Sequence, residues 1–368
     1  MKENITIIKR MVYVFILLVL GYIILTKAKH ILQPIALSLL LSYLLYPLTN
    51  FLEKKWHFPR SLSIILAILL GLSILFVAVN LIIIQIKVVI RDFPIIKQQA
   101  IANIQAWQLY IDHKFHFSAT EQEIWIQKQI AKLLDESNKL LSTFVKGSFT
   151  TIETILFIPI YTFFMLLYRD KGKNFVIKIS SQKNNILTKN LLEEISKVTT
   201  KYIIGVTTVV SILAVAHSVA LLSFGLKYAI PIALISALLS FIPYFGTLVS
   251  GLIPFTFSLV LSSNQYMPLM IIIYFVFITF IDHNILTPTI TGGNVSLNPL
   301  ATIIGLLIAS FVWGVPGMII VVPLLATFKT ICDKIPGLEP YGYIIGIDSH
   351  GLDIGVLIRK IKKKIKKN

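Results

Sequence analysis

The chain has 368 residues, of which 56% are hydrophobic and only 14% are charged, and its mean hydropathy is +0.81. A water-soluble domain carries about 25% charged residues. The composition therefore excludes a soluble enzyme and a disordered protein, and the single cysteine, Cys332, excludes a disulfide scaffold. On so apolar a chain the net charge of +17 fits cytoplasmic loops and lipid headgroups rather than a nucleic-acid partner. These properties predict an all-α, polytopic transmembrane helical protein.

Continuous apolar runs predict the membrane-spanning helices, because lipid satisfies no backbone polar group and a helix of about 20 residues crosses the hydrocarbon core. In chain order the predicted spans are Met11–Leu25, Ile31–Leu52, Ser61–Ile90, Phe149–Tyr168, Tyr202–Phe224, Ala229–Leu261, Pro268–Leu286 and Leu300–Phe328. Two of them are interrupted, at Ile242–Gly246 and at Gly314–Gly317. The segment Ala229–Leu261 is either one broken crossing or two half-helices in a hairpin. Counted as one crossing, it gives about eight spans.

An even number of crossings places both termini on one side of the membrane, and the charges select the side. On the side of the termini lie 23 of the 34 Lys and Arg residues. The positive-inside rule then predicts that both termini are cytoplasmic, although Lys27 and Lys29 fall on the opposite side. The excess of Lys over Arg and the abundance of Ile are typical of an AT-rich bacterial genome. We predict a multi-pass protein of the bacterial inner membrane.

The spans and the polar segments divide the chain into four regions. Residues 1–90 form an N-terminal three-span region, and residues 91–148 form an amphipathic helical insert expected outside the cytoplasm. The insert packs against a neighbouring subunit or the membrane surface, or against the chain's own spans. Residues 149–335 form a transport core with a basic cytoplasmic connector at 169–201. Residues 336–368 form a basic tail that binds anionic headgroups or only anchors the topology.

The sequence contains no motif for bond-breaking chemistry. It lacks the glycine-rich phosphate loop, the His-Glu-x-x-His pattern and the Gly-x-Ser-x-Gly elbow. Cys332 lies at a span end and is expected to be a structural thiol. We therefore predict that the protein is not an enzyme and expect no catalytic residue, no metal site and no cofactor.

Two ionisable residues lie inside predicted spans, where such side chains usually face a cavity or a partner. Asp282 lies in Pro268–Leu286 and is followed by Asn284. It either carries a proton or holds a cation or polar solute, or it caps a broken helix at the interface. His217 lies midway along Tyr202–Phe224. It either titrates near neutral pH or stays neutral and bonded to a neighbouring helix.

Proline and glycine residues interrupt the last spans three times in succession. Irregular backbone at membrane depth survives where it is buried in protein or lines an aqueous cavity, and broken helices direct free N–H and C=O groups at such a cavity. Packing kinks explain one break well but three successive breaks less well. The predicted solute pathway comprises Asp282, Asn284, His217, Pro243, Tyr244, Gly246, Pro288, Asn298, Pro299, Gly314, Pro316 and Gly317.

Several short runs within residues 149–340 stand in a characteristic order. They are Gly225-Leu-Lys-Tyr-Ala, Phe241-Ile-Pro-Tyr-Phe-Gly, Asp282-His-Asn-Ile-Leu-Thr-Pro, Val295-Ser-Leu-Asn-Pro-Leu and Trp313-Gly-Val-Pro-Gly-Met. This order resembles the autoinducer-2 exporter family of bacterial membrane proteins. The resemblance implies a homo-oligomeric permease with about eight helices, and members are assigned either to autoinducer-2 export or to sodium or lithium/proton antiport. Many members have Glu-Gly-Asn where this chain has Asp282-His283-Asn284, so the acid is kept but shortened.

The leading hypothesis is a secondary-type exporter of a small polar solute, with autoinducer-2 as the named candidate. A second hypothesis is a sodium or lithium/proton antiporter in which Asp282, together with His217, alternates between proton and cation. A third is a non-transporting membrane scaffold that binds partners through the insert and the tail. The expected partners are membrane lipids, a small polar solute or monovalent cation, and further copies of the chain.

Overall fold

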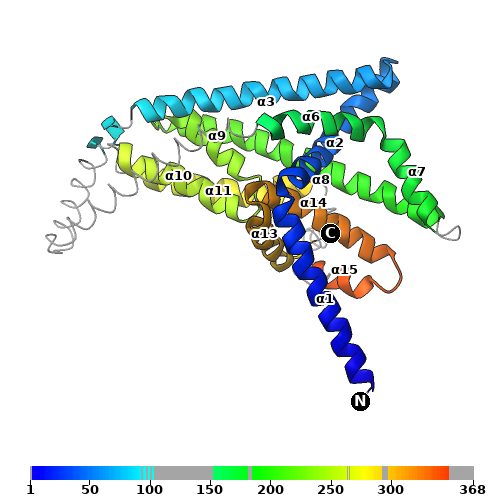
Figure 1. The fold of residues 1–368 in the computed structure, drawn as a ribbon. Coiled ribbons are helices and arrows are strands. Elements are labelled where there is room, and N and C mark those ends of the chain that lie inside the picture. The colour runs from blue at the N-terminus through cyan, green and yellow to red at the C-terminus, as the bar shows by residue number, and fades with distance from the viewer. Residues whose placement is uncertain are drawn as a thin grey trace, which may run out of the picture. The chain divides into compact units, whose positions relative to one another are not determined.

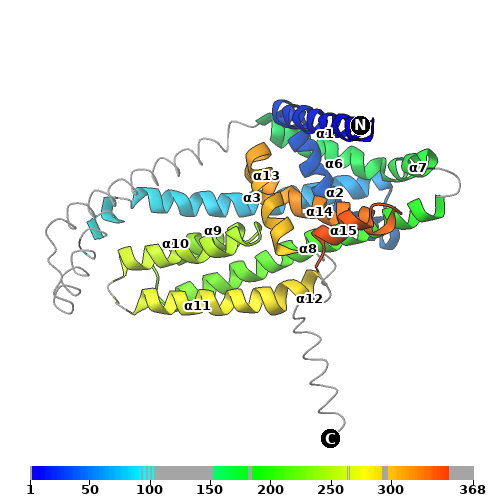
Figure 2. The same ribbon diagram turned by 90° about the horizontal axis from the view of Figure 1, so that it is seen from below.

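The computed structural model describes residues 2–92, 94–96, 98–99, 102, 152–180, 185–262, 264, 266–291 and 297–347. Most of the predicted insert at 91–148 and the tail beyond residue 347 lie outside these described residues. The described part is almost entirely helical, which confirms the prediction of an all-α protein (Figures 1 and 2).

The larger helices follow the predicted spans; most extend beyond the predicted limits, whereas the helix Ile152–Leu167 is shorter than the predicted Phe149–Tyr168. In chain order they are α1 (Lys2–Lys27), α2 (Lys29–Lys55), α3 (Arg60–Arg91), α6 (Ile152–Leu167), α7 (Arg169–Ile179), α8 (Asn185–Ser223), α9 (Ala229–Leu239), α10 (Phe245–Leu261), α11 (Met267–Ile281), the π-helical segment η2 (Asp282–Leu286), α12 (Thr287–Thr291), α13 (Pro299–Trp313), α14 (Val315–Lys334) and α15 (Glu339–Ile345). The predicted connector at 169–201 is α7 together with the first part of α8, which continues unbroken into the span.

Five helices in the described part are long and apolar enough to cross a membrane. They are Lys29–Lys55, Arg60–Ile84, Asn185–Ser223, Met267–Thr291 and Val315–Lys334. Shorter apolar helices accompany them, among them α9, α10 and α13. This pattern confirms a polytopic helical membrane protein.

The break predicted at Ile242–Gly246 is a reversal of the chain, so the hairpin alternative for Ala229–Leu261 holds. Ser236 Oγ on α9 donates to the carbonyl oxygen of Ser250 on α10 at 2.8 Å. In one continuous helix these two residues would lie about 21 Å apart along the axis. A Cβ at Gly246 would lie 1.8 Å from the carbonyl oxygen of Leu239, so only glycine allows the two helices to approach this closely.

The break predicted at Gly314–Gly317 is a second reversal, between α13 and α14, rather than an interruption of one span. Gly305 faces Leu325, whose Cδ1 would lie 2.6 Å from a Cβ at position 305. A continuous helix would separate these two residues by about 30 Å. The turn residue Gly314 has φ 67° and ψ −142°, a backbone region that is essentially restricted to glycine.

The two hairpins leave the predicted orientation unchanged. An antiparallel helix pair returns to its starting side or crosses twice, so replacing two single crossings with two hairpins keeps the total even. Residues 262–298 contain no Lys or Arg, so the basic residues keep the same partition between the two sides. Cytoplasmic termini therefore stay a prediction of the positive-inside rule.

The chain divides into two compact units. The first unit comprises Met1–Tyr43, Tyr168–Ile203 and Gly293–Asn368, and the second comprises Leu44–Leu167 and Ile204–Gly292. The core of the second unit joins α8, α9 and α11, and α10 packs on α9 and α11 (Figures 1 and 2). Its buried residues are Leu221, Leu226, Ala229, Ile232, Ala233, Met267, Ile271 and Phe275. In the first unit, α14 packs on α13 and α15, and α13 also contacts α1.

Candidate functional site

A π-helical segment interrupts the span-length helix Met267–Thr291 at Asp282. Pro288 has no N–H to donate to the carbonyl four residues earlier, and its ring crowds that carbonyl, which disfavours a regular α-helix at this turn. The helix widens by one residue instead, and the N–H of Thr287 bonds to the carbonyl of Asp282, five residues earlier. The proline thus favours the irregular backbone around Asp282 without dictating it, because Pro254 and Pro323 lie inside regular α-helices of the same chain.

The carboxylate of Asp282 is buried, with 6% of the residue exposed. Thr287 Oγ1 donates to Asp282 Oδ1 at 2.7 Å. The π-helical spacing places these two residues one above the other, which an α-helix would do for residues three or four apart. Because burying a carboxylate without partners is strongly unfavourable, the hydroxyl of Thr287 stabilises Asp282 in this position.

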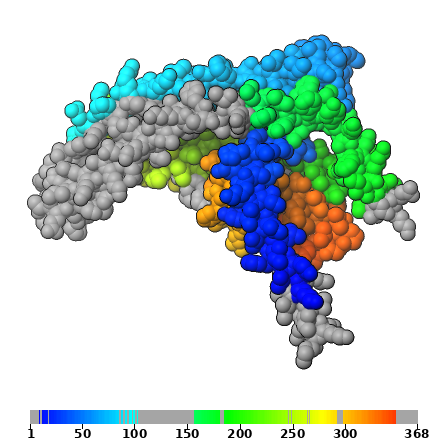
Figure 3. Space-filling model, viewed as in Figure 1, coloured from blue at the N-terminus to red at the C-terminus, as the bar shows by residue number. Residues whose placement is uncertain are grey.

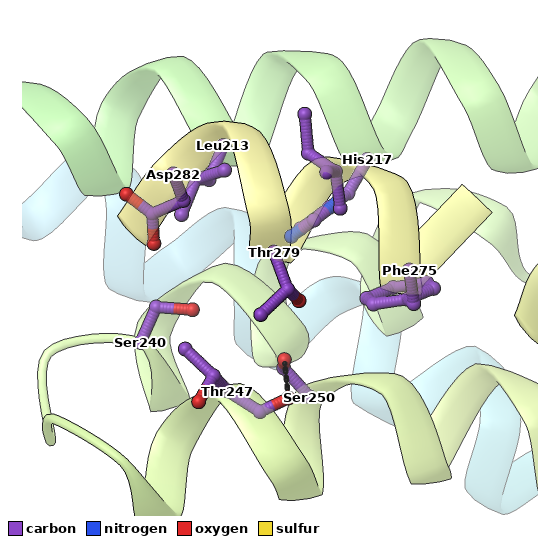
Figure 4. A pocket seen from close by; sticks show the side chains of 9 residues that line it. Leu213, His217, Ser240, Thr247, Ser250, Phe275, Thr279 and Asp282 are labelled. Atoms are coloured by element: carbon purple, nitrogen blue, oxygen red, sulfur yellow. Dashed lines mark hydrogen bonds between the residues drawn. The ribbon is translucent and has the colours of Figure 1, made fainter. Parts of the chain in front are cut away.

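A small cavity with both polar and apolar lining residues lies beside Asp282 within the second unit (Figure 4). Its lining residues are Leu213 and His217 from α8, Ser240, Thr247 and Ser250 from the α9–α10 hairpin, and Phe275, Ile278, Thr279 and Asp282 from α11 and η2. About 10 Å³ of the cavity is open to the centre of a water molecule, which is space for about one water. The structure thus places one carboxylate, one imidazole and four hydroxyls around a space of the size of a water or a small ion.

The hydroxyl hydrogens on the hairpin side of the cavity are directed to the backbone. Ser240 Oγ donates to Ser236 O at 3.3 Å, Thr247 Oγ1 to Tyr244 O at 3.0 Å, and Ser250 Oγ to Thr247 O at 2.8 Å. A hydroxyl has one hydrogen and two oxygen lone pairs. These oxygens therefore keep lone pairs for a cation, a water or a donor group of a solute.

His217 is bonded to a neighbouring helix, which agrees with the second of the two alternatives that the sequence left open. Its Nδ1 lies 3.0 Å from the hydroxyl oxygen of Tyr274 on α11, and its ring stacks on Phe275 at a centroid distance of 4.8 Å. The residue is buried and bonded to a neighbouring helix, and it also lines the cavity that contains Asp282. Both ionisable residues predicted inside the spans therefore border one space.

A family model described as AI-2E family transporter matches residues 12–337. The chain belongs to the AI-2E transporter family. YrrI of Bacillus subtilis, named as a transport protein, is 25% identical over 314 residues, which cover 82% of this chain and 86% of YrrI. The permease PerM of Escherichia coli K12 is 23% identical over 349 residues, which cover 87% of this chain and 92% of PerM. These matches confirm the family that the order of the motifs indicated, and the protein is a membrane transporter.

In this AI-2E transporter, five of the predicted pathway residues lie near the cavity without lining it. Pro243, Tyr244 and Gly246 belong to the turn that brings Ser240 and Thr247 together. Tyr244 has φ 64°, and its ring lies edge-on to that of His283 at 6.5 Å. The other two, Asn284 and Pro288, are exposed, and Asn284 Nδ2 donates to the carbonyl of Phe280 in its own helix at 2.8 Å.

The remaining five predicted residues, Asn298, Pro299, Gly314, Pro316 and Gly317, belong to the first unit. Asn298 Oδ1 accepts the N–H of Ala301 at 2.7 Å and so caps α13, which begins at Pro299. Asn298 Nδ2 donates to the carbonyls of Ile344 at 2.7 Å and Gly346 at 3.1 Å. In the AI-2E transporter this amide fastens the end of α15 to the start of α13, so its hydrogen-bonding groups are used within the protein.

Sequence reasoning missed the hydroxyl residues of the cavity and the Thr287 donor. Ser240, Thr247, Ser250 and Thr279 are single small residues in apolar helices, a pattern that is common wherever membrane helices pack. One signal was available for Thr287, because Pro288 predicts a disturbed turn in which residues five apart become neighbours. The four hydroxyl residues could not be selected from the sequence, because only the hairpin brings Ser240 and Thr247 to the same cavity.

Proposed function

We propose that this AI-2E transporter is a secondary-type exporter of a small polar solute, and that the solute or a coupled ion passes the cavity at Asp282. The observation that supports this proposal is a buried carboxylate, bonded to Thr287 at 2.7 Å, next to a hydroxyl-lined cavity in apolar helices. Ionisable groups at membrane depth are energetically unfavourable unless they face a cavity or a partner, and they often mark a transport pathway. The proposal includes the bacterial inner membrane and cytoplasmic termini.

Autoinducer-2 is the first candidate solute, because the family to which the chain belongs is named after autoinducer-2 export. An organic solute is larger than one water, so the cavity would have to widen as the helices move during transport. Pro243 lies in the turn next to the cavity and Gly246 in the first turn of α10, so a movement of the hairpin would change the cavity.

The size of the cavity favours a second candidate, sodium or lithium/proton antiport. Hard monovalent cations prefer oxygen ligands, and the cavity offers the Asp282 carboxylate with hydroxyl oxygens that keep free lone pairs. A carboxylate that alternately holds a proton and a cation would exchange one for the other across the membrane.

The test is flux in proteoliposomes of the purified full-length chain, with autoinducer-2 and with a sodium gradient read by a pH-sensitive dye. Asp282→Asn is compared with Asp333→Asn, which removes a carboxylate on an exposed part of α14. Autoinducer-2 flux that is lost only in Asp282→Asn supports the exporter. Sodium-dependent proton movement that is lost only in Asp282→Asn supports the antiporter. Wild-type flux in a folded Asp282→Asn variant, or no flux above empty liposomes, would contradict the proposal and favour the membrane scaffold.

A further inference from the structure

Helix α7 begins where an apolar helix reaches the edge of the membrane. Only Tyr168 separates it from the end of α6 at Leu167. In the second unit, Arg60 Nη2 at the start of span α3 donates to the carbonyl of Leu166 at 2.8 Å. A guanidinium at the end of an apolar span lies at the level of the headgroups. Since Leu166 lies at that level, α7 starts at the membrane–water boundary.

The side of α7 that is apolar is also exposed. At 100° per residue, Phe175, Val176 and Ile179 fall on one side of the helix, and their exposed fractions are 63%, 43% and 70%. The whole of α7 contains no fully buried residue. Figure 3 shows α7 on the visible surface, in green at the right. Three large apolar side chains on a helix that also carries many charges require an apolar partner outside the described part of the chain.

Basic residues flank this apolar side and indicate which partner covers it. Lys171 and Lys178 lie along one edge and are exposed, while Lys173 lies near the other edge, where its Nζ contacts Glu193 Oε1 on α8 at 2.8 Å. The ion pair marks the side of α7 that is turned toward α8, and the apolar side chains are exposed beside it. An apolar face between lysines is the pattern of helices that lie in the plane of a membrane, where the lysines reach the phosphates.

We propose that α7 is an interfacial helix that binds an anionic lipid leaflet. Phe175, Val176 and Ile179 insert at the level where the acyl chains begin, and the ammonium groups of Lys171 and Lys178 contact lipid phosphates. Basic residues near an anionic membrane surface are attracted to it, and the attraction falls off within a Debye length. This inference is independent of the transported solute, since it concerns only the membrane surface next to the span.

The first test measures the surroundings of the helix in the full-length chain. Cys332→Ala removes the only native thiol, and a fluorophore is attached at Ile179→Cys or, as the matched control, at the exposed Asn174→Cys on the opposite side of α7. The proteins are reconstituted into vesicles of phosphatidylcholine and phosphatidylglycerol. We expect nitroxide lipids to quench the label at 179 several-fold more than the label at 174, and aqueous iodide to show the reverse order. A label at 179 that iodide quenches, or that neither quencher reaches because protein covers it, contradicts the proposal.

The second test concerns the lysines. In the double variant Lys171→Glu, Lys178→Glu, the label at 179 should lose most of its quenching by nitroxide lipids. The labelled protein that keeps both lysines should show the same loss in vesicles of phosphatidylcholine alone. Unchanged quenching in both cases would exclude a role for anionic lipid. The melting temperature and the size-exclusion profile of each variant establish that a loss of quenching does not reflect misfolding.

Discussion

The two helical hairpins have similar sequence signals but different surroundings. Both α9–α10 and α13–α14 reverse at a short turn, with a proline and a glycine in the turn or in the first residues of the following helix. In the first hairpin the polar side chains near the turn, Ser240 and Thr247, line a cavity next to Asp282. In the second hairpin the polar groups near the turn bind the backbone, since Gln33 Nε2 donates to Trp313 O at 3.0 Å and Trp313 Nε1 donates to Leu25 O at 2.9 Å.

This difference shows that a broken helix alone does not identify a transport site. The backbone groups released at a turn must find partners at membrane depth. Around Trp313, side chains of α2 and α13 supply hydrogen bonds and hold the turn against α1, which fits a scaffold. Around Ser240, the side-chain oxygens keep lone pairs that face a cavity, which fits a binding site. The useful criterion is thus whether polar atoms are used within the protein or remain open to a cavity.

The largest expected effect is that of Gly246→Ala, which tests how tightly the first hairpin must close. A Cβ would lie 1.8 Å from the backbone oxygen of Leu239, and the neighbouring chain cannot rotate away as a side chain could. We expect destabilisation of about 3 kcal/mol or more, together with loss of flux. The measurement is thermal unfolding in detergent followed by size exclusion. Gly21→Ala is the control, because nothing lies within 4 Å of a Cβ there, and equal stability of the two variants would contradict the close approach.

Thr287→Val tests the assignment of the site to Asp282 without removing the carboxylate. Valine keeps the shape but loses the hydroxyl that donates to Asp282 Oδ1 at 2.7 Å. A hydrogen bond to a charged group contributes about 1.5–3 kcal/mol, so we expect the initial rate of transport to fall about 10- to 100-fold. Thr287→Ser retains the donor and should transport at close to the wild-type rate. Equal rates for the valine and serine variants would show that the bond plays no part in transport.

The sequence predicts much of the fold because membrane insertion depends on length and hydropathy. The predicted limits Ser61–Ile90 agree with α3 within one residue at each end. Charged residues such as Arg60 and Arg91 flank the apolar run, and the sequence shows them directly. The direction of the chain after a break is not encoded in the same way. A proline and a glycine reveal that a helix ends, whereas the reversal depends on contacts such as that between Ser236 and Ser250.

The candidate site was only partly predictable for a related reason. Asp282 and His217 were identified because ionisable residues are rare in spans, and both line the cavity. Asn298 was selected for its place between Gly and Pro residues, yet its amide caps α13 and holds α15. The polarity of a side chain can be read from the sequence, but the partner that satisfies it cannot.

Trp313→Phe tests whether the second hairpin is a scaffold. The change keeps an aromatic ring but removes the Nε1 donor to Leu25 O, a loss of about 1 kcal/mol. We expect the melting temperature to fall by a few degrees while the rate of flux stays at the wild-type level. Trp56→Phe is the control, since the ring of Trp56 packs on Phe51 and Phe58. A loss of transport at unchanged stability would place the second hairpin in the solute pathway.

The smallest expected effect concerns the bond that ties the start of the first hairpin to the end of α3. Tyr228 Oη donates to Asp92 Oδ2 at 2.8 Å, and this bond, together with that from Arg91, holds the pKa of Asp92 below its ordinary value. Burial and the neighbouring carboxylate raise the pKa of Tyr228 to about 12, so the donor keeps its proton at neutral pH. Tyr228→Phe should therefore slightly lower the melting temperature at neutral pH.

The change of the Tyr228→Phe effect with pH distinguishes the hydrogen bond to Asp92 from packing of the Tyr228 ring. Because the pKa of Asp92 is lower in the folded state, its stabilisation is present above the ordinary Asp pKa of about 3.9. It is lost as the pH falls through the lower, folded-state value. The difference in melting temperature between wild type and Tyr228→Phe should thus be constant near neutral pH and shrink in acid, whereas the exposed Tyr266→Phe should show no such trend. A difference that stays constant into acid would mean that Tyr228 holds α9 through its ring alone, and the first hairpin would then lack the polar anchor that Trp313 gives the second.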